Sequence, residues 1–164
     1  MTEPAAQKKE DWTAYKSTPP KPKDLANPGL APLNDQDEYV WELLRISLGM
    51  GVQKPGNRNQ NGDTCDLFYT VWQEEKTKNL MMVNLRVDGL GEGWKRAKTA
   101  KFERGIVQFF DRIGIPLTEG KAPDFGSLFI KGMRYRSRVD VGLTDNKPNG
   151  YYHLNMPTVR RYQQ

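Results

Sequence analysis

The sequence has very few of the residues that bind metals or form disulfides. Among 164 residues there is one cysteine, Cys65, and one histidine, His153. A single cysteine excludes an internal disulfide and a cysteine-based zinc site, and a single histidine excludes a cluster of histidine ligands. We therefore expect neither a metal nor a cofactor, and we interpret Cys65 and His153 as ordinary strand residues.

Long apolar runs are also missing. No run approaches the ~20 apolar residues that a membrane-spanning helix needs, and the first residues, MTEPAAQKKEDW, lack the apolar core of a signal peptide. The G-x-S-x-G, H-E-x-x-H and Walker patterns do not occur, and GLGEG at 89–93 does not have the G-x-G-x-x-G spacing. These absences predict a cytoplasmic protein that is not an enzyme.

Residues 1–36 differ from the rest of the chain in composition. They are rich in Pro, Lys, Asp and Asn, and their few apolar residues follow no period. Such a segment cannot bury enough apolar surface to fold alone. We predict a Pro-rich, largely disordered tail at 1–36, available to a protein partner, and one folded domain at 37–164.

Five strands are predicted in the folded part. Runs of β-forming residues occur at 38–52, 64–73 and 79–87, and two more lie within 131–157. In the first run, a bend or bulge is expected at the glycines near its end. The residues of that run that we expect to face inward are Val40, Leu44, Ile46 and Leu48.

One helix is predicted between the third and fourth strands, over residues 99–116. Thr99 can cap its start, while Gly114 and Pro116 can end it. The order β-β-β-α-β-β is that of the OB-fold, a five-stranded barrel that binds oligonucleotides or oligosaccharides. Other α+β folds share these elements and stay open. The apolar face of the helix consists of Phe102, Ile106, Phe109, Phe110 and Ile113.

Positive charge is concentrated in two parts of the domain. The net charge is +5, and residues 131–161 carry seven basic and two acidic side chains, while 94–104 carry five basic and one acidic. Arg134, Arg136 and Arg138 alternate along a strand and share one face, about 6.6–6.8 Å apart. This spacing suits a phosphate backbone. The alternative is a solvated outer face paired with acids of neighbouring strands.

Aromatic side chains complete the predicted binding site, because unpaired bases stack on them at about 1–3 kcal/mol each. Tyr69 and Trp72 face opposite sides of the second strand, and we expect Trp72 to face outward. Loops 53–63 and 142–150 are expected to close over the bound strand. The predicted nucleic-acid-binding residues are Arg134, Arg136, Arg138, Lys95, Arg96, Lys98, Trp72, Trp94, Tyr151, Lys54, Arg58 and Lys147.

Several phrases between residues 37 and 162 resemble one protein family. They are EYVWELLRISL, KNLMMVNLRV, FFDRIGIP, LFIKGMRYRSRVDV and NGYYHLNMPTV. They are similar to the layout of OB-fold single-stranded DNA-binding proteins from tailed phages and prophages. The chain departs from the family in its Pro-rich N-terminal tail and its basic end, RRYQQ. The resemblance points to Gly132, Arg138, Val139, Asn155 and Pro157 as pattern positions.

This resemblance implies sequence-tolerant binding of single-stranded DNA in phage replication or recombination, and a location in the host cytoplasm. Two alternatives stay open. An RNA-binding OB-fold protein would share nearly all of this physics and differ in contacts to the 2′-hydroxyl. A non-catalytic assembly or adaptor module would use the same basic strand to bind acidic protein surfaces.

Overall fold

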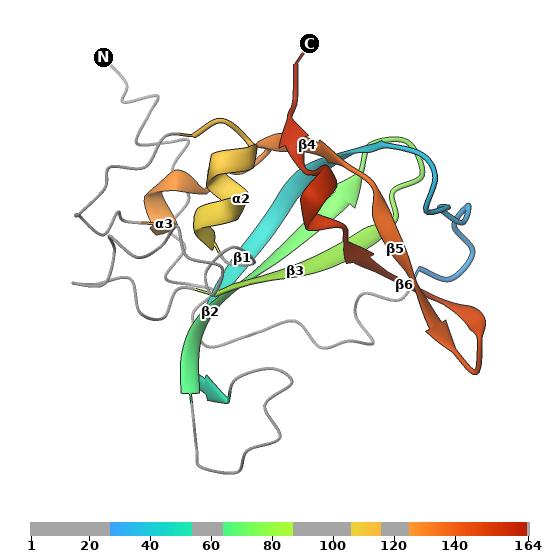
Figure 1. Cartoon of the computed structure of the whole chain (residues 1–164), viewed down its shortest axis with the longest axis horizontal. Coiled ribbons are helices and arrows are strands. Elements are labelled where there is room, and N and C mark those ends of the chain that lie inside the picture. Colours follow the sequence, from blue (N-terminus) through green and yellow to red (C-terminus); the bar gives the residue numbers. More distant parts are fainter. Residues whose placement is uncertain (1–26, 54–63, 87–105, 116–124, 164) are drawn as a thin grey trace.

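The computed structural model describes residues 27–53, 64–86, 106–115 and 125–163, and the fold is mainly β (Figure 1). One antiparallel sheet has the order β3-β2-β1-β4-β7, and a smaller sheet pairs β5 with β6. The strands are β1 Tyr39–Gln53, β2 Thr64–Glu74, β3 Leu80–Arg86, β4 Arg134–Ser137, β5 Val139–Thr144, β6 Lys147–Leu154 and β7 Arg160–Arg161. The helical elements are α2 Ile106–Arg112, the single turn α3 Phe125–Leu128 and the 3-10 turn η5 Met156–Thr158.

Strand β1 connects the two halves of the larger sheet, since it pairs with β2 on one side and β4 on the other. Its register with β2 shifts between Leu43 and Arg45, so Leu44 is an extra residue in a bulge. The inward orientation predicted for Leu44 is therefore wrong: Leu43 is fully buried and Leu44 only half-buried. The same prediction is wrong for Val40, which is buried but lies opposite Arg136, on the other face from the core. A second shift, between Gly49 and Val52, confirms the irregularity predicted at the glycines.

The core is built around three aromatic rings from different elements. Trp72 of β2, Tyr135 of β4 and Phe109 of α2 are fully buried. The ring centroids of Trp72 and Tyr135 are 4.5 Å apart, and Phe109 lies 5.6 Å from Trp72 and 5.2 Å from Tyr135. Contacts of this kind contribute about 0.5–1.5 kcal/mol each beyond the burial of apolar area. They fix α2 against the sheet.

Helix α2 buries the predicted apolar face. Gly114, just after the helix, has a φ of +83°, which is the left-handed conformation expected at a helix end. A Cβ at this position would lie 2.8 Å from Cδ of Arg161, a flexible side chain that can shift, so the positive φ is the main reason for glycine there. Thr99 and Phe102, at the predicted start, lie outside the described residues. The buried residues of this face are Ile106, Phe109, Phe110 and Ile113.

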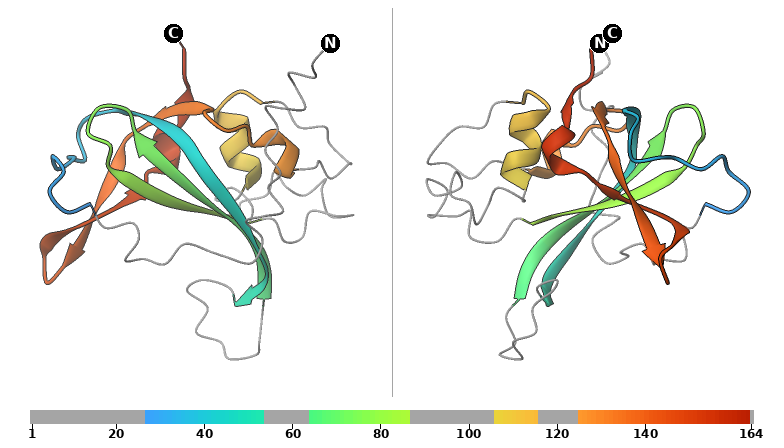
Figure 2. Two further views of the ribbon diagram at one scale, coloured as in Figure 1. Left: turned by 180° about the vertical axis from the view of Figure 1, so that it is seen from behind. Right: turned by 45° about the vertical axis from the view of Figure 1, so that its right-hand side comes forward.

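The predicted mainly β succession, with a helix after the third strand, is confirmed, but the structure describes seven strands instead of five, and these do not close into a barrel. The fourth predicted strand is interrupted at Arg138, where β4 ends and β5 begins. β5 pairs with β6, and β6 packs against β3. No backbone ladder joins β3 to β6 in the described part of the chain. Figure 2 shows α2 and the tip of the β5–β6 hairpin at opposite ends of the molecule.

A side chain bridges β3 and β6 where the backbone ladder is missing. The amide nitrogen of Asn27 donates to the carbonyl oxygens of Leu80 (3.2 Å) and Gly150 (2.9 Å). Its Oδ1 accepts from the backbone N–H of Leu80 at 2.7 Å. Because Leu80 opens β3 and Gly150 lies in β6, Asn27 connects the two edges.

Residues 27–36, which we predicted as the end of the disordered tail, pack on the domain at the same seam. The backbone N–H of Leu33 donates to Oη of Tyr152 at 2.9 Å. The side-chain amide of Asn79 donates to the carbonyl oxygen of Ala31 at 2.6 Å. The packed structure therefore begins before residue 37, because this segment satisfies polar groups of the strands. Residues 1–26 lie outside the described residues.

Replacing Asn27 with alanine removes three hydrogen bonds and leaves polar groups of Leu80 and Gly150 without these partners. We expect the free energy of unfolding to fall by about 1–3 kcal/mol. Urea denaturation measures this change. The exposed Gln163 serves as control, and Gln163→Ala should change the free energy of unfolding by less than about 0.5 kcal/mol. Equal urea midpoints for the two variants would contradict the bridging role of Asn27.

Candidate nucleic-acid interface

Strand β4 divides its side chains between two faces, as the sequence predicts. Tyr135 and Ser137 are fully buried, Arg134 is exposed, and Arg136 and Arg138 are half-buried. Successive residues of a strand point to opposite faces. Because Tyr135 is held in the aromatic core, its arginine neighbours must point outward.

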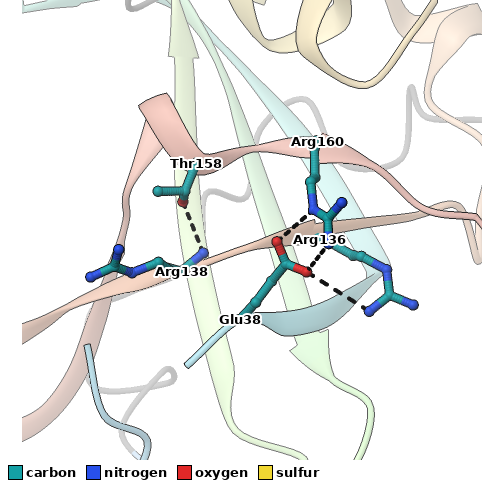
Figure 3. A network of polar contacts seen from close by, with 5 residues as sticks. All are labelled: Glu38, Arg136, Arg138, Thr158 and Arg160. Atoms are coloured by element: carbon teal, nitrogen blue, oxygen red, sulfur yellow. Dashed lines mark hydrogen bonds and ion pairs between the residues drawn. The ribbon is translucent and has the colours of Figure 1, made fainter. Parts of the chain in front are cut away.

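Strand β7 adds an arginine that the predicted set lacks. Arg160 lies directly opposite Arg136 in the ladder, and like charges in such positions repel. The carboxylate of Glu38 lies between them (Figure 3). It accepts from Nε and Nη2 of Arg160, both at 2.6 Å, and its Oε1 lies 4.0 Å from Nη1 of Arg136. The hydrogen bonds from Arg160, with the attraction of both guanidinium groups, lower the pKa of Glu38.

An aromatic ring and a second carboxylate join these arginines. Nε and Nη2 of Arg134 donate to Oε1 of Glu42 at 3.2 and 3.0 Å. The Cζ atoms of Arg134 and Arg136 lie 5.6 and 5.1 Å from the ring centroid of Tyr162, within cation–π range. Hydrogen bonding to Tyr162 and to Glu42 raises the pKa of Arg134. We call Arg134, Arg136, Arg160 and Tyr162 the arginine strip.

Arg138 has a different environment from the strip. Its backbone N–H donates to Oγ1 of Thr158 at 2.8 Å, as Figure 3 shows. Its guanidinium donates through Nε (3.1 Å) and Nη2 (2.8 Å) to the carbonyl oxygen of Asp35. Arg138 therefore ties the segment before β1 to the junction of β4 and β5, at the point where the predicted strand is interrupted.

Trp72 does not face outward, so the prediction that it stacks a base is wrong. The indole is fully buried, and its Nε1 donates to Oγ1 of Thr70 at 2.7 Å. The large ring fills the space between β2 and α2. Tyr69, three residues earlier, consequently lies on the outer face of β2, where it is half-buried and opposite Ser47 of β1 and Asn84 of β3.

The outward residues of all five strands lie on one continuous face of the larger sheet. Glu42 is opposite both Gln73 of β2 and Arg134 of β4, which places the arginine strip on the same side as Tyr69. Arg45 of β1 lies between these two regions, opposite Val71. Its Nε is buried and has no hydrogen-bond partner in the described structure. We call this surface the outer face; in order from β3 to β7 it carries Asn84, Tyr69, Arg45, Arg134, Arg136 and Arg160.

The predicted loop 142–150 is the tip of the β5–β6 hairpin. Asp145 and Asn146 have φ values of 53° and 64°, which is typical of a two-residue type I′ turn. Lys147 is exposed next to this turn, and Tyr151 is half-buried in β6. Paired strands therefore replace most of the predicted loop, because the turn needs only two residues.

Several predicted site residues cannot be placed. Their assignment to the binding site, like that of loop 53–63, stays a prediction. The residues missing from the predicted set are Arg45, Tyr69, Arg160 and Tyr162. Arg160 and Tyr162 had a signal in the basic and aromatic segment RRY, and Tyr69 had one in its alternation with Trp72, whereas Arg45 had none. The predicted residues that lie outside the described ranges are Lys54, Arg58, Trp94, Lys95, Arg96 and Lys98.

In the described ranges, no group of three or more His, Cys, Asp or Glu side chains is arranged to hold a metal ion. Among the described helices, none has the length and apolar character needed to cross a membrane. No protein-family model matches the chain, and no curated protein matches its sequence. The similarity to phage single-stranded DNA-binding proteins therefore stays a prediction, and the geometry of the outer face carries the functional argument.

Replacing Glu38 with glutamine should change how stability depends on pH. The pKa of Glu38 is lowered in the folded protein, so its contribution is complete above the ordinary value of 4.5 and is lost as the pH falls through the lower folded value. We expect the wild type to be more stable than Glu38→Gln at neutral pH, and the two to converge well below pH 4.5. Urea denaturation across this range tests the prediction, and a difference independent of pH would contradict it.

Proposed function

We propose that the protein is a non-catalytic, sequence-tolerant single-stranded DNA-binding protein with an OB fold, acting in phage DNA replication or recombination. The observation that carries the proposal is the outer face, on which arginines from three strands lie with two tyrosines. Guanidinium groups match phosphate oxygens through paired hydrogen bonds. Aromatic rings at a surface provide platforms on which unpaired bases stack regardless of sequence, and both tyrosines are half-buried on this face.

The order and packing of the strands support the OB fold. β4 and β5 correspond to one strand of such a barrel, interrupted at Arg138. β6 then follows as the last strand and packs against β3, the third. The helix lies between the third and fourth strands in sequence and packs on Trp72 and Tyr135. These features agree with a five-stranded barrel whose helix covers one end.

The position of the tyrosines suggests a path for the bound strand. In OB folds the oligonucleotide contacts strands 2 and 3, where Tyr69 and Asn84 lie. The arginine strip lies beyond β1 on the same face, so a strand that crosses β1 would pass Arg45 and reach Arg134. Bases would stack on Tyr69 and Tyr162, and phosphates would bind the arginines.

A protein adaptor is the second candidate, because one observation favours it. Glu38 and Glu42 already pair with the arginine strip, and carboxylates of an acidic partner could make the same contacts. RNA binding shares the physics of the first proposal, and the two differ only in contacts to the 2′-hydroxyl.

Fluorescence polarisation with labelled oligo-dT, duplex DNA and RNA of equal length separates these candidates. We expect oligo-dT to bind most tightly, with log K falling against log salt concentration by about 0.7 per phosphate contacted. Weak and equal binding to all three would favour the adaptor, and affinity independent of salt would contradict the proposal. Trp41 and Trp72 are fully buried, so neither should be quenched by direct stacking.

Removing one guanidinium from the strip should remove one phosphate contact. For Arg136→Gln we expect affinity for oligo-dT to fall several-fold and the salt slope to become shallower by about 0.7. Lys76→Gln is the matched control, because Lys76 is an exposed cation in the turn after β2 and is not one of the residues of the strip. If both variants lose affinity equally, the effect is one of net charge, and the strip is not the binding site.

A further inference from the structure

The carboxylate of Glu38 lies between two arginines of neighbouring strands. The side of the Arg160 guanidinium, Nε and Nη2, faces its two carboxylate oxygens, with both hydrogen bonds at 2.6 Å. Nη1 of Arg136 lies 4.0 Å from Oε1. This paired geometry is the one by which arginine also binds phosphate. The two guanidinium groups come from neighbouring strands and meet at a single anion.

The segment that holds this carboxylate is short, exposed and ordered by its own hydrogen bonds. Oδ1 of Asn34 accepts from the backbone N–H groups of Gln36 and Asp37, both at 2.8 Å. The carbonyl of Asp35 receives the guanidinium of Arg138. Residues 34–38 are all exposed. Glu38 is thus presented to the strip from a surface turn, without the core packing that would prevent its carboxylate from moving away.

Glu42, the other carboxylate near the strip, differs in this respect. It contacts one guanidinium, that of Arg134, and lies within β1. Glu38 instead neutralises two arginines that face each other across a ladder, where their repulsion would otherwise destabilise the pair. If the Glu38 carboxylate moves away, the two adjacent positive charges of Arg136 and Arg160 attract another anion to the same point.

We propose that Arg136 and Arg160 form one phosphate-binding site, and that Glu38 is its internal competitor, which a phosphate of the bound DNA strand displaces. The inference deepens the proposed function and rests on it. Exposed ion pairs are weak, so the competition lowers affinity by a modest factor and does not block binding. Glu38 keeps the two arginines paired and aligned in the free protein.

Removing the carboxylate should therefore strengthen DNA binding. For Glu38→Gln in the full chain we expect oligo-dT to bind about two- to fivefold more tightly. The salt slope should also become steeper, by at most about 0.7, because the same phosphate contact is then made without freeing an internal carboxylate that attracts a cation of its own. Glu75→Gln is the matched control: it changes the net charge equally, and Glu75 lies in the turn after β2. Fluorescence polarisation measures all the proteins over a series of salt concentrations.

A second pair of variants shows whether the gain depends on the proposed site. The double variant with Glu38→Gln and Arg160→Gln should bind oligo-dT no more tightly than Arg160→Gln alone, because one of the two arginines of the site is already missing. If Glu38→Gln folds poorly by circular dichroism, Glu38→Asp is used. Its side chain is one methylene shorter, so we expect weaker contacts to the two guanidinium groups and tighter binding than for Glu75→Gln. If the wild type binds oligo-dT with salt dependence but the Glu38 variants tighten no more than Glu75→Gln, the competitor role is wrong and the proposed function stands. If the wild type itself does not bind, both proposals fail.

Discussion

The packing of Tyr135 against Trp72 and Phe109 is the contact on which the rest of the structure depends. It joins β2, α2 and β4, three elements well separated in the sequence, at a point where all three rings are fully buried. The same contact fixes the direction of every side chain on β4, because residues of a strand alternate between faces. Because the side chain of Tyr135 points into the core, the side chains of Arg134 and Arg136 must point toward the outer face. Core packing therefore arranges the charged surface.

The charge of that surface is balanced locally. Arg136 and Arg160 face each other in a ladder, an arrangement that would cost stability without a counter-ion. The Glu38 carboxylate supplies one, and the hydrogen bonds from Arg160 and the attraction of both guanidinium groups lower its pKa. Such an arrangement holds the guanidinium groups in a defined geometry before any ligand arrives. On a surface that binds a polyanion, an anion of the ligand can displace the Glu38 carboxylate from the arginines. On a surface of ordinary ion pairs, the carboxylate stays paired.

The segment before β1, residues 27–38, makes contacts with the strands at both of its ends. At its start, Asn27 joins β3 to β6 across a seam where the described strands share no ladder. At its end, Asp35 and Glu38 contact Arg138 and Arg160. Composition placed these residues in a disordered tail, since Pro- and Asn-rich segments without apolar period seldom fold alone. They are ordered by polar groups that the strands provide, which composition does not reveal.

The sequence by itself determined the local features of this protein. Alternation along β4 and the described part of the apolar face of α2 depend on the backbone periods of neighbouring residues, and these were predicted correctly. The order of strands and helix was predicted in outline only, because the fourth strand is split and α3 and β7 were not expected. The tertiary structure decided whether Trp72 or Tyr69 faces outward, because the period requires only that the two differ. It also decided that residues 38, 136 and 160 meet at one point. Contacts of this kind depend on which strands pair and in what register, and no pattern of neighbouring residues contains that information.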